Sequence, residues 1–181
     1  MVEKFIPTAE GLVEYAKTNL HVPHIYLWDG VGEYLTDELL DKLIEKYPNW
    51  YTPERIAVRR SLVDRGIRCW DCIGLIISYK WGDYHQGKPE LYNAEEHWGT
   101  GQMFQQEGLI KGEIDTLPER PGLVVYMKGH VGVYIGDGWV IECTCKNVKT
   151  WEGYELLGGI HKTNLKDRPW THWVEFPGIQ Y

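Results

Sequence analysis

The sequence predicts a single α+β domain in which helices come first and an antiparallel β-sheet follows. Capped segments with helical apolar periodicity fill the first half, and short strand-like segments follow from Pro121. The 181 residues contain no internal repeat, low-complexity tract or linker. A chain of this length with 43% apolar residues can bury one sizeable core and is short for two domains.

The expected helices carry recognisable start and stop signals. Thr8 and Thr36 are typical N-caps, and Pro53 is typical of a first helical turn. Pro48 and Gly82 end the helices that precede them. The expected helical ranges are 8–20, 37–47, 53–66, 75–81 and 100–108.

The second half reads as strands rich in β-branched and aromatic residues. The expected strands are 123–127, 130–135, 139–144, 159–163 and 173–176. Helices followed by strands indicate an α+β domain. We therefore expect one domain over residues 1–181, with a helical N-terminal part at 1–68 and a catalytic helix plus β-sheet core at 69–181.

The hairpin formed by the second and third of these strands determines which side chains share a face. With a three-residue loop at 136–138, Ile135 opposes Trp139. The same register pairs Val133 with Ile141 and Val131 with Cys143 on an apolar face. His130 and Glu142 then lie on the opposite face, diagonal to each other across the ladder.

A cysteine and a histidine in these positions indicate nucleophilic catalysis. Cys72 lies just ahead of the apolar run 75–81, where a helix dipole favours a thiolate. His130 opens a strand and supplies the imidazole needed to take the thiol proton. Glu142 is the carboxylate expected to orient His130, and Gly132 leaves space on the same face. The other histidines lack a base-like context.

Composition limits the partners. The net charge of −7 and pI near 5.5 disfavour nucleic acid and anionic lipid. No apolar stretch resembles a secretory signal or a membrane span, so we expect synthesis in a cytoplasm and no membrane partner. The 12 Tyr and nine Trp are residues that often line sites for sugars or peptides, although most should belong to the core and its rim. We expect a monomer.

The four cysteines allow two other interpretations. Cys69 and Cys72 form a Cys-x-x-Cys, but a thioredoxin-like redox pair needs a preceding strand, and the run before it reads as helical and charged. A four-cysteine zinc site would need Cys143 and Cys145 to converge, and we expect them on opposite faces of their strand. Apart from Cys72, the cysteines are expected to pack as small hydrophobic residues.

Three segments together resemble a known family. They are Asp71-Cys72-Ile73-Gly74-Leu75, the strand Gly129-His130-Val131-Gly132, and Tyr26-Leu27-Trp28-Asp29-Gly30. They resemble the NlpC-type, papain-like cysteine peptidases that cut bacterial peptidoglycan, from about residue 23 onward. The closing segment 166–173 is similar to versions found in bacteriophage lysins and prophages.

The resemblance implies roles for individual residues. It implies a papain-like fold with Cys72 as nucleophile, His130 as base and Glu142 as orienter. It also implies that Tyr26, Trp28 and Asp71 bind substrate, that the Cys72 backbone N–H helps bind the oxyanion, and that no metal or cofactor is needed.

The sequence departs from the family pattern at three positions. Ile73 replaces a serine, Asp29 replaces a glycine, and Glu142 stands where histidine, asparagine or glutamine is commoner. The first two replacements affect which details of substrate binding can be carried over from the family. A carboxylate at the third is chemically sound, because it is a good partner for an imidazolium.

The implied reaction is hydrolysis of an amide in the wall stem peptide, most often between D-glutamate and the diamino acid. An N-acetylmuramoyl-L-alanine amidase with the same triad, or an inactive wall-binding or phage structural module of this fold, are the alternatives. An endolysin of this kind would be made in the host cytoplasm without a signal peptide and act on the wall after release or export.

Overall fold

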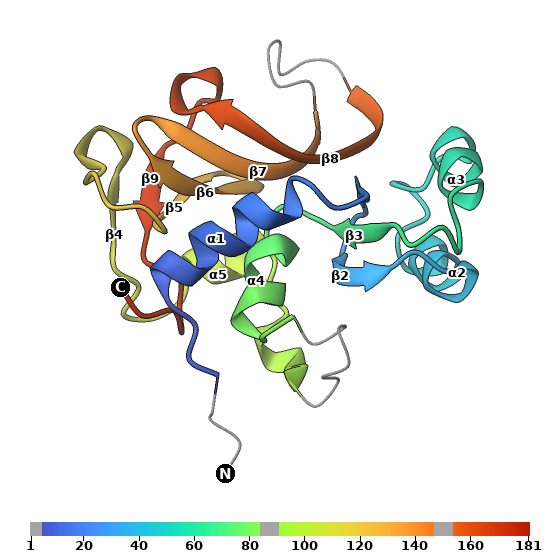
Figure 1. Cartoon of the computed structure of the whole chain (residues 1–181), viewed down its shortest axis with the longest axis horizontal. Coiled ribbons are helices and arrows are strands. Elements are labelled where there is room, and N and C mark those ends of the chain that lie inside the picture. The colour runs from blue at the N-terminus through green and yellow to red at the C-terminus, as the bar shows by residue number, and fades with distance from the viewer. Residues whose placement is uncertain (1–4, 84–90, 147–153) are drawn as a thin grey trace.

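The computed structural model describes residues 5–83, 91–146 and 154–181 and has the α+β class that the sequence predicts. A six-stranded antiparallel sheet has the order β4-β9-β5-β6-β7-β8, and a three-stranded sheet has the order β1-β3-β2. Figure 1 shows α1 and α4 against one side of the large sheet, with α2 and α3 beside the small sheet.

The helices and strands have the following bounds. The helices are α1 (Ala9–Asn19), α2 (Asp37–Lys46), α3 (Pro53–Arg60), α4 (Gly74–Lys80) and α5 (Thr100–Phe104). The small sheet contains β1 (His24–Tyr26), β2 (Val31–Tyr34) and β3 (Arg68–Trp70). The large sheet contains β4 (Lys111–Glu113), β5 (Val124–Met127), β6 (His130–Gly136), β7 (Trp139–Lys146), β8 (Tyr154–Asn164) and β9 (His172–Val174).

The helix starts follow the predicted caps. The Thr8 hydroxyl accepts a hydrogen bond from the Gly11 amide at 3.1 Å, and Thr36 accepts one from Leu39 at 3.1 Å. These bonds satisfy amides that have no partner within the helix. The predicted ends of two helices are wrong, because α3 ends at Arg60 rather than residue 66 and α5 ends at Phe104 rather than 108.

The prediction of a wholly helical N-terminal part is wrong. Strands β1 and β2 lie within residues 1–68, and the run before Cys72, expected to be helical, contains β3. β3 pairs parallel with β1 and antiparallel with β2. Strands of three or four residues are too short to show alternation, and a parallel pair needs a partner far away in the sequence. The sequence pattern therefore gave no signal for this sheet.

The hairpin between β6 and β7 confirms one predicted pairing and corrects another. Val133 pairs with Ile141 as predicted, but Trp139 pairs with Gly136, and the register shifts at Ile135. The turn has two central residues, Asp137 and Gly138, with φ of 52° and 73°. Two positive φ values are typical of a type I′ hairpin turn. The turn is one residue shorter than predicted and β6 contains one extra residue, Ile135, so the pairing of Val133 with Ile141 is preserved.

The core lies between the large sheet and the helices α1 and α4, which contact each other. Cys72 belongs to the buried apolar cluster there, together with Val131 and Val133 of β6. A second cluster fills the space between α2, α3 and the small sheet. None of the helices within the described ranges is long and apolar enough to cross a bilayer.

Candidate active site

Cys72 lies in the turn that joins β3 to α4, and Asp71 holds this turn in place. One carboxylate oxygen of Asp71 accepts a hydrogen bond from the Gly74 amide at 2.6 Å, and the other accepts one from the Asp29 amide at 3.1 Å. The first bond caps the start of α4. The second ties that start to the segment after β1, so Asp71 has a structural role at the position where the resemblance implies substrate binding.

Two glycines allow this segment and α4 to approach each other. A Cβ on Gly74 would overlap the carbonyl of Gly30, and a Cβ on Gly30 would lie 2.9 Å from the Leu27 oxygen. Asp29, at the position where the resemblance implies a glycine, has φ of 69°. Aspartate tolerates this left-handed conformation better than most residues, which explains why the replacement is compatible with the turn.

His130 and Glu142 form the contact that the sequence predicts. The His130 Nε2 and the Glu142 Oε2 are 2.6 Å apart, and both side chains are buried. The Glu142 carboxylate also accepts a hydrogen bond from the Thr163 hydroxyl at 2.7 Å. The Nε of Arg168 lies 3.1 and 3.2 Å from its two oxygens. Burial alone would raise the pKa of Glu142, but these partners hold it below its ordinary value.

Three members of this site carried no role in the sequence prediction. They are Thr163 from β8, and Arg168 and Trp170 from the segment before β9. The Trp170 ring stacks on the His130 ring with centroids 5.4 Å apart and an interplanar angle of 14°. The expected resemblance of residues 166–173 to phage lysins assigned no role to these side chains, because the partner of a side chain on a distant strand cannot be read from sequence spacing.

Cys72 lies beside the strand that carries His130. The backbone amide of Val131 stabilises the thiolate form of Cys72, and Gly129 lines the same cavity as Cys72. The neighbours of His130 on both sides thus face the cysteine or its cavity. The expectation of a lowered thiol pKa is wrong, because burial, followed by the charge of Asp71, raises the pKa of Cys72.

Two neighbouring cavities share Tyr26, Trp28 and Gly129 in their linings. The cavity that contains Cys72 has a volume of about 630 Å³, and the cavity that contains His130 has a volume of about 320 Å³. The first is lined by the charged residues Asp29, Lys46 and Asp71, and the second by Arg55, Lys128 and Lys146. A further cavity of about 630 Å³ along α1 is lined by none of the predicted site residues.

The predicted substrate residues Tyr26 and Trp28 therefore lie at the junction of both cavities. Tyr26 is buried, whereas Trp28 is 42% exposed and packs against Trp50 with ring centroids 6.1 Å apart. An exposed indole beside a cysteine and a histidine offers an apolar surface for a bound chain. His97, to which the sequence assigned no role, lines the Cys72 cavity and lies 3.4 Å from Asp29.

No family model, curated protein or solved structure matches this chain. The chemistry of the site therefore rests on its own residues and distances.

The remaining cysteines are buried in the core. All four cysteines are free thiols, and Cys69 lies within β3 rather than at a helix start, unlike a redox pair. Cys143 and Cys145 belong to the same buried cluster, and Cys145 also lines the cavity that contains His130, at the register shift between Thr144 and Lys146. The described residues contain no group of three His, Cys, Asp or Glu side chains that could hold a metal ion.

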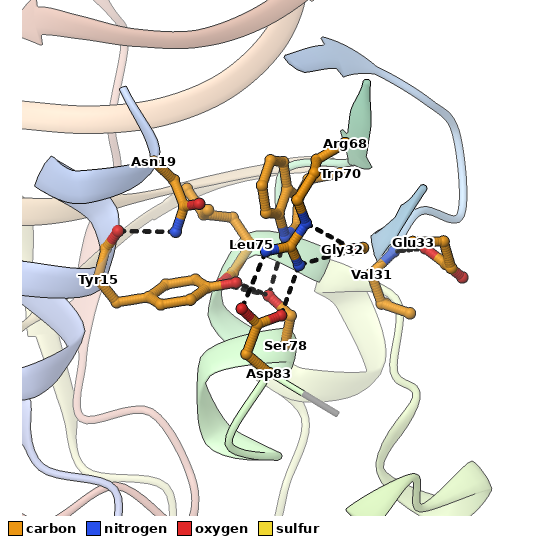
Figure 2. Close-up of polar contacts among 10 residues, drawn as sticks. All are labelled: Tyr15, Asn19, Val31, Gly32, Glu33, Arg68, Trp70, Leu75, Ser78 and Asp83. Carbon is orange, nitrogen blue, oxygen red and sulfur yellow. Dashed lines mark hydrogen bonds and ion pairs between the residues drawn. The ribbon is translucent and has the colours of Figure 1, made fainter. Parts of the chain in front are cut away.

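A buried polar cluster fixes the other end of α4 (Figure 2). Arg68 of β3 donates to Asp83, just after α4, at 2.9 Å and to the Gly32 carbonyl at 2.9 Å. Ser78 of α4 accepts a hydrogen bond from the Trp70 indole at 3.0 Å and lies 2.9 Å from the Tyr15 hydroxyl oxygen of α1. These contacts tie α4 to the small sheet and to α1, and α4 in turn positions Cys72.

Proposed function

We propose that this chain is a cysteine peptidase of papain-like architecture that hydrolyses an amide bond in the peptidoglycan stem peptide. The observation that carries the proposal is the 2.6 Å contact between Glu142 of β7 and His130 of β6, the strand that lies against Cys72. A nucleophile, a base and a group that orients the base are the parts that such hydrolysis requires.

The contact with Glu142 assigns the two nitrogens of His130. A carboxylate accepts hydrogen bonds, so Nε2 carries the proton that is donated to Glu142. Nδ1 is then the nitrogen that exchanges a proton with Cys72. Because burial raises the pKa of the Cys72 thiol, the proton is transferred to Nδ1 as the sulfur attacks, rather than before the substrate binds.

The reaction proceeds in two halves. The Cys72 sulfur attacks the amide carbonyl carbon, and the Cys72 backbone N–H stabilises the oxyanion. The imidazolium of His130 gives its proton to the leaving amine as the C–N bond breaks, which leaves a thioester. His130 then takes a proton from water, the hydroxide adds to the thioester, and the thiol leaves with the proton restored.

The bond that is cut can be proposed more specifically than amide hydrolysis in general. We propose the bond between D-glutamate and the diamino acid, with Tyr26, Trp28 and Asp71 on the substrate side of the site. Tyr26 and Trp28 line both cavities, which supports this placement. Asp71 already accepts two backbone hydrogen bonds, so any contact with substrate would add to its capping role. An amidase that cuts the sugar to L-alanine bond would use the same triad.

The decisive experiment is clearing of purified bacterial cell walls by wild type and by Cys72→Ala. Wild type should clear the walls and Cys72→Ala should not, while Cys69→Ala, a buried cysteine outside the site, should retain activity. Equal clearing by wild type and Cys72→Ala would overturn the assignment. Mass spectrometry of the fragments from a defined muropeptide identifies the bond, since endopeptidase and amidase products differ in the new amino terminus.

A further inference from the structure

Arg168 is buried beside the base of the proposed triad. It follows the short 3₁₀ helix at Leu165–Asp167, and its side chain has no exposed area. Its Nε contacts both oxygens of Glu142, and its Nη2 lies 3.4 Å from the Lys146 carbonyl oxygen. It thus contacts β7 at two points.

Stability alone is a weak reason for this arrangement. Removing a guanidinium and a carboxylate from water is costly, and a well-packed apolar pair often serves a core equally well. The Glu142 carboxylate is fully buried and also contacts His130. The effect of Arg168 on His130 therefore explains the pair better than stability does.

The charges define this effect. A buried carboxylate beside an imidazole favours the imidazolium, which already carries the proton that the base must accept. A second cation on the same carboxylate opposes that preference and keeps Glu142 ionised. Arg168 thus offsets the charge of the carboxylate that holds the imidazole through Nε2.

Trp170 acts from the same segment. Its ring stacks on the His130 ring, two residues after Arg168, so this short stretch contacts both partners of the pair. Stacking restricts rotation of the imidazole about its side-chain bonds. One segment from outside the hairpin therefore contacts both the ring of the base and the carboxylate that orients it.

We propose that Arg168 is a positioning residue for His130: it contacts both oxygens of Glu142 and so holds the carboxylate that orients the imidazole toward Cys72. The proposal rests on the function proposed above, because it assigns a role within the same site.

Other ionisable groups surround the pair and define the background for a pH measurement. His161 of β8 is the register partner of Glu142 on β7. Lys128 precedes β6, and with Arg55 of α3 and Lys146 of β7 it lines the cavity that contains His130. None of these is changed in the variants below, so their contribution is the same in every profile.

The test compares pH profiles of kcat and KM for wild type, Arg168→Met and Arg168→Lys on a defined muropeptide. In Arg168→Met we expect kcat to fall about tenfold with KM unchanged within about twofold, as for a loss of base positioning. We expect the acid limb of its pH profile, where kcat falls with decreasing pH, to move up by about one pH unit or more, because the positive charge of Arg168 has been removed. Arg168→Lys should restore the position of the limb, since the charge is retained.

A matched control removes an arginine from an exposed ion pair. Arg120 lies 3.0 Å from Glu175 on the surface, and Arg120→Met should leave the pH profile unchanged. An unchanged limb and kcat in folded Arg168→Met would overturn the proposal. So would a lower thermal stability with an unshifted limb, which is the result that a purely structural role predicts.

A second variant keeps the proposal testable if Arg168→Met fails to fold. The double variant Glu142→Gln with Arg168→Met removes both buried charges together, which avoids an unpaired carboxylate. If Arg168 acts through Glu142, the double variant should have the same kcat as Glu142→Gln alone. A further tenfold loss of kcat in the double variant would show that Arg168 acts by another route.

If wild type releases no fragment, the proposed function has failed. If wild type cleaves and these shifts are absent, only the role of Arg168 has failed.

Discussion

Gly74, the first residue of α4, lies against the backbone carbonyl of Gly30 so closely that a side chain on Gly74 would overlap it. The two glycines belong to segments that are far apart in the sequence. Their contact sets how near the Cys72 turn comes to the segment that carries Tyr26 and Trp28. It gives a packing reason for glycine at position 74, whereas Gly30 is confined by the backbone oxygens of Leu27 and Cys69.

Gly74→Ala should therefore destabilise the fold. The added methyl group meets backbone rather than a flexible side chain, so we expect a loss of about 1–3 kcal/mol in the free energy of unfolding. Urea denaturation measures this loss. Gly101→Ala in α5 is the matched control, because a Cβ there meets nothing within 4 Å. It should raise stability by about 0.5–1 kcal/mol. Equal effects at both positions would contradict the close approach.

Asp71→Asn should flatten the pH dependence of stability. Burial raises the pKa of Asp71 from 3.8 to about 7, so the folded state binds a proton more tightly than the unfolded state. The contribution of Asp71 is then fully present below pH 4 and is lost as the pH rises to about 7, by at most about 1.4 kcal/mol per pH unit. Urea denaturation of wild type and Asp71→Asn between pH 4 and pH 7 measures the difference. Parallel curves would show that the carboxyl group is not perturbed.

Glu142→Gln should lower kcat far more than it raises KM. The Glu142 carboxylate accepts hydrogen bonds from His130, Thr163 and Arg168. A glutamine amide is uncharged and has only one acceptor oxygen, so it cannot replace all three hydrogen bonds. A loss of about 10²–10⁴ in kcat is typical when the group that orients a catalytic histidine is neutralised. Thr163→Val removes one uncharged hydrogen-bond donor to Glu142 and should lower kcat much less. A Glu142→Gln enzyme with wild-type kcat would exclude Glu142 from the mechanism.

Cys72 should alkylate slowly at neutral pH in the resting protein. Because burial raises the pKa of its thiol, the fraction of thiolate grows only as the pH becomes alkaline. Iodoacetamide labelling at a series of pH values, followed by mass spectrometry of the Cys72 peptide, measures the rate. The same labelling in denaturant gives the rate of an ordinary thiol. Labelling in the native state that is faster than this reference below pH 7 would support the preformed thiolate that the helix dipole suggested.

The sequence predicted the features that depend on local signals. Thr8 and Thr36 cap their helices, and strands β5 to β7 lie where alternation placed them, because caps and period-two patterns act within a few residues. The contact between His130 and Glu142 was also predictable, since a hairpin register follows from turn length and pattern. That prediction succeeded although the assumed three-residue turn was wrong.

Long-range partners were not predictable from one sequence. The small sheet depends on the pairing of β1 with β3, and these strands are separated in the sequence by α2 and α3. No local sequence pattern encodes such a long-range pairing. Arg168 reaches Glu142 from the end of the chain, where an arginine next to Asp167 reads as an ordinary surface charge. The raised pKa of Cys72 is likewise a property of burial, whereas the sequence shows only its place before a helix.

The extra residue at Ile135 has a consequence for how relatives of this chain could be found. If Ile135 were lost, Asp137 and Gly138 would join strands of equal length, and Tyr134 would still face Val140. The base and the acid would meet as before, although the interval of 12 positions between them would be one residue shorter. A search pattern that fixes this interval would miss such a sequence, and one that allows a single gap after Tyr134 would retain it.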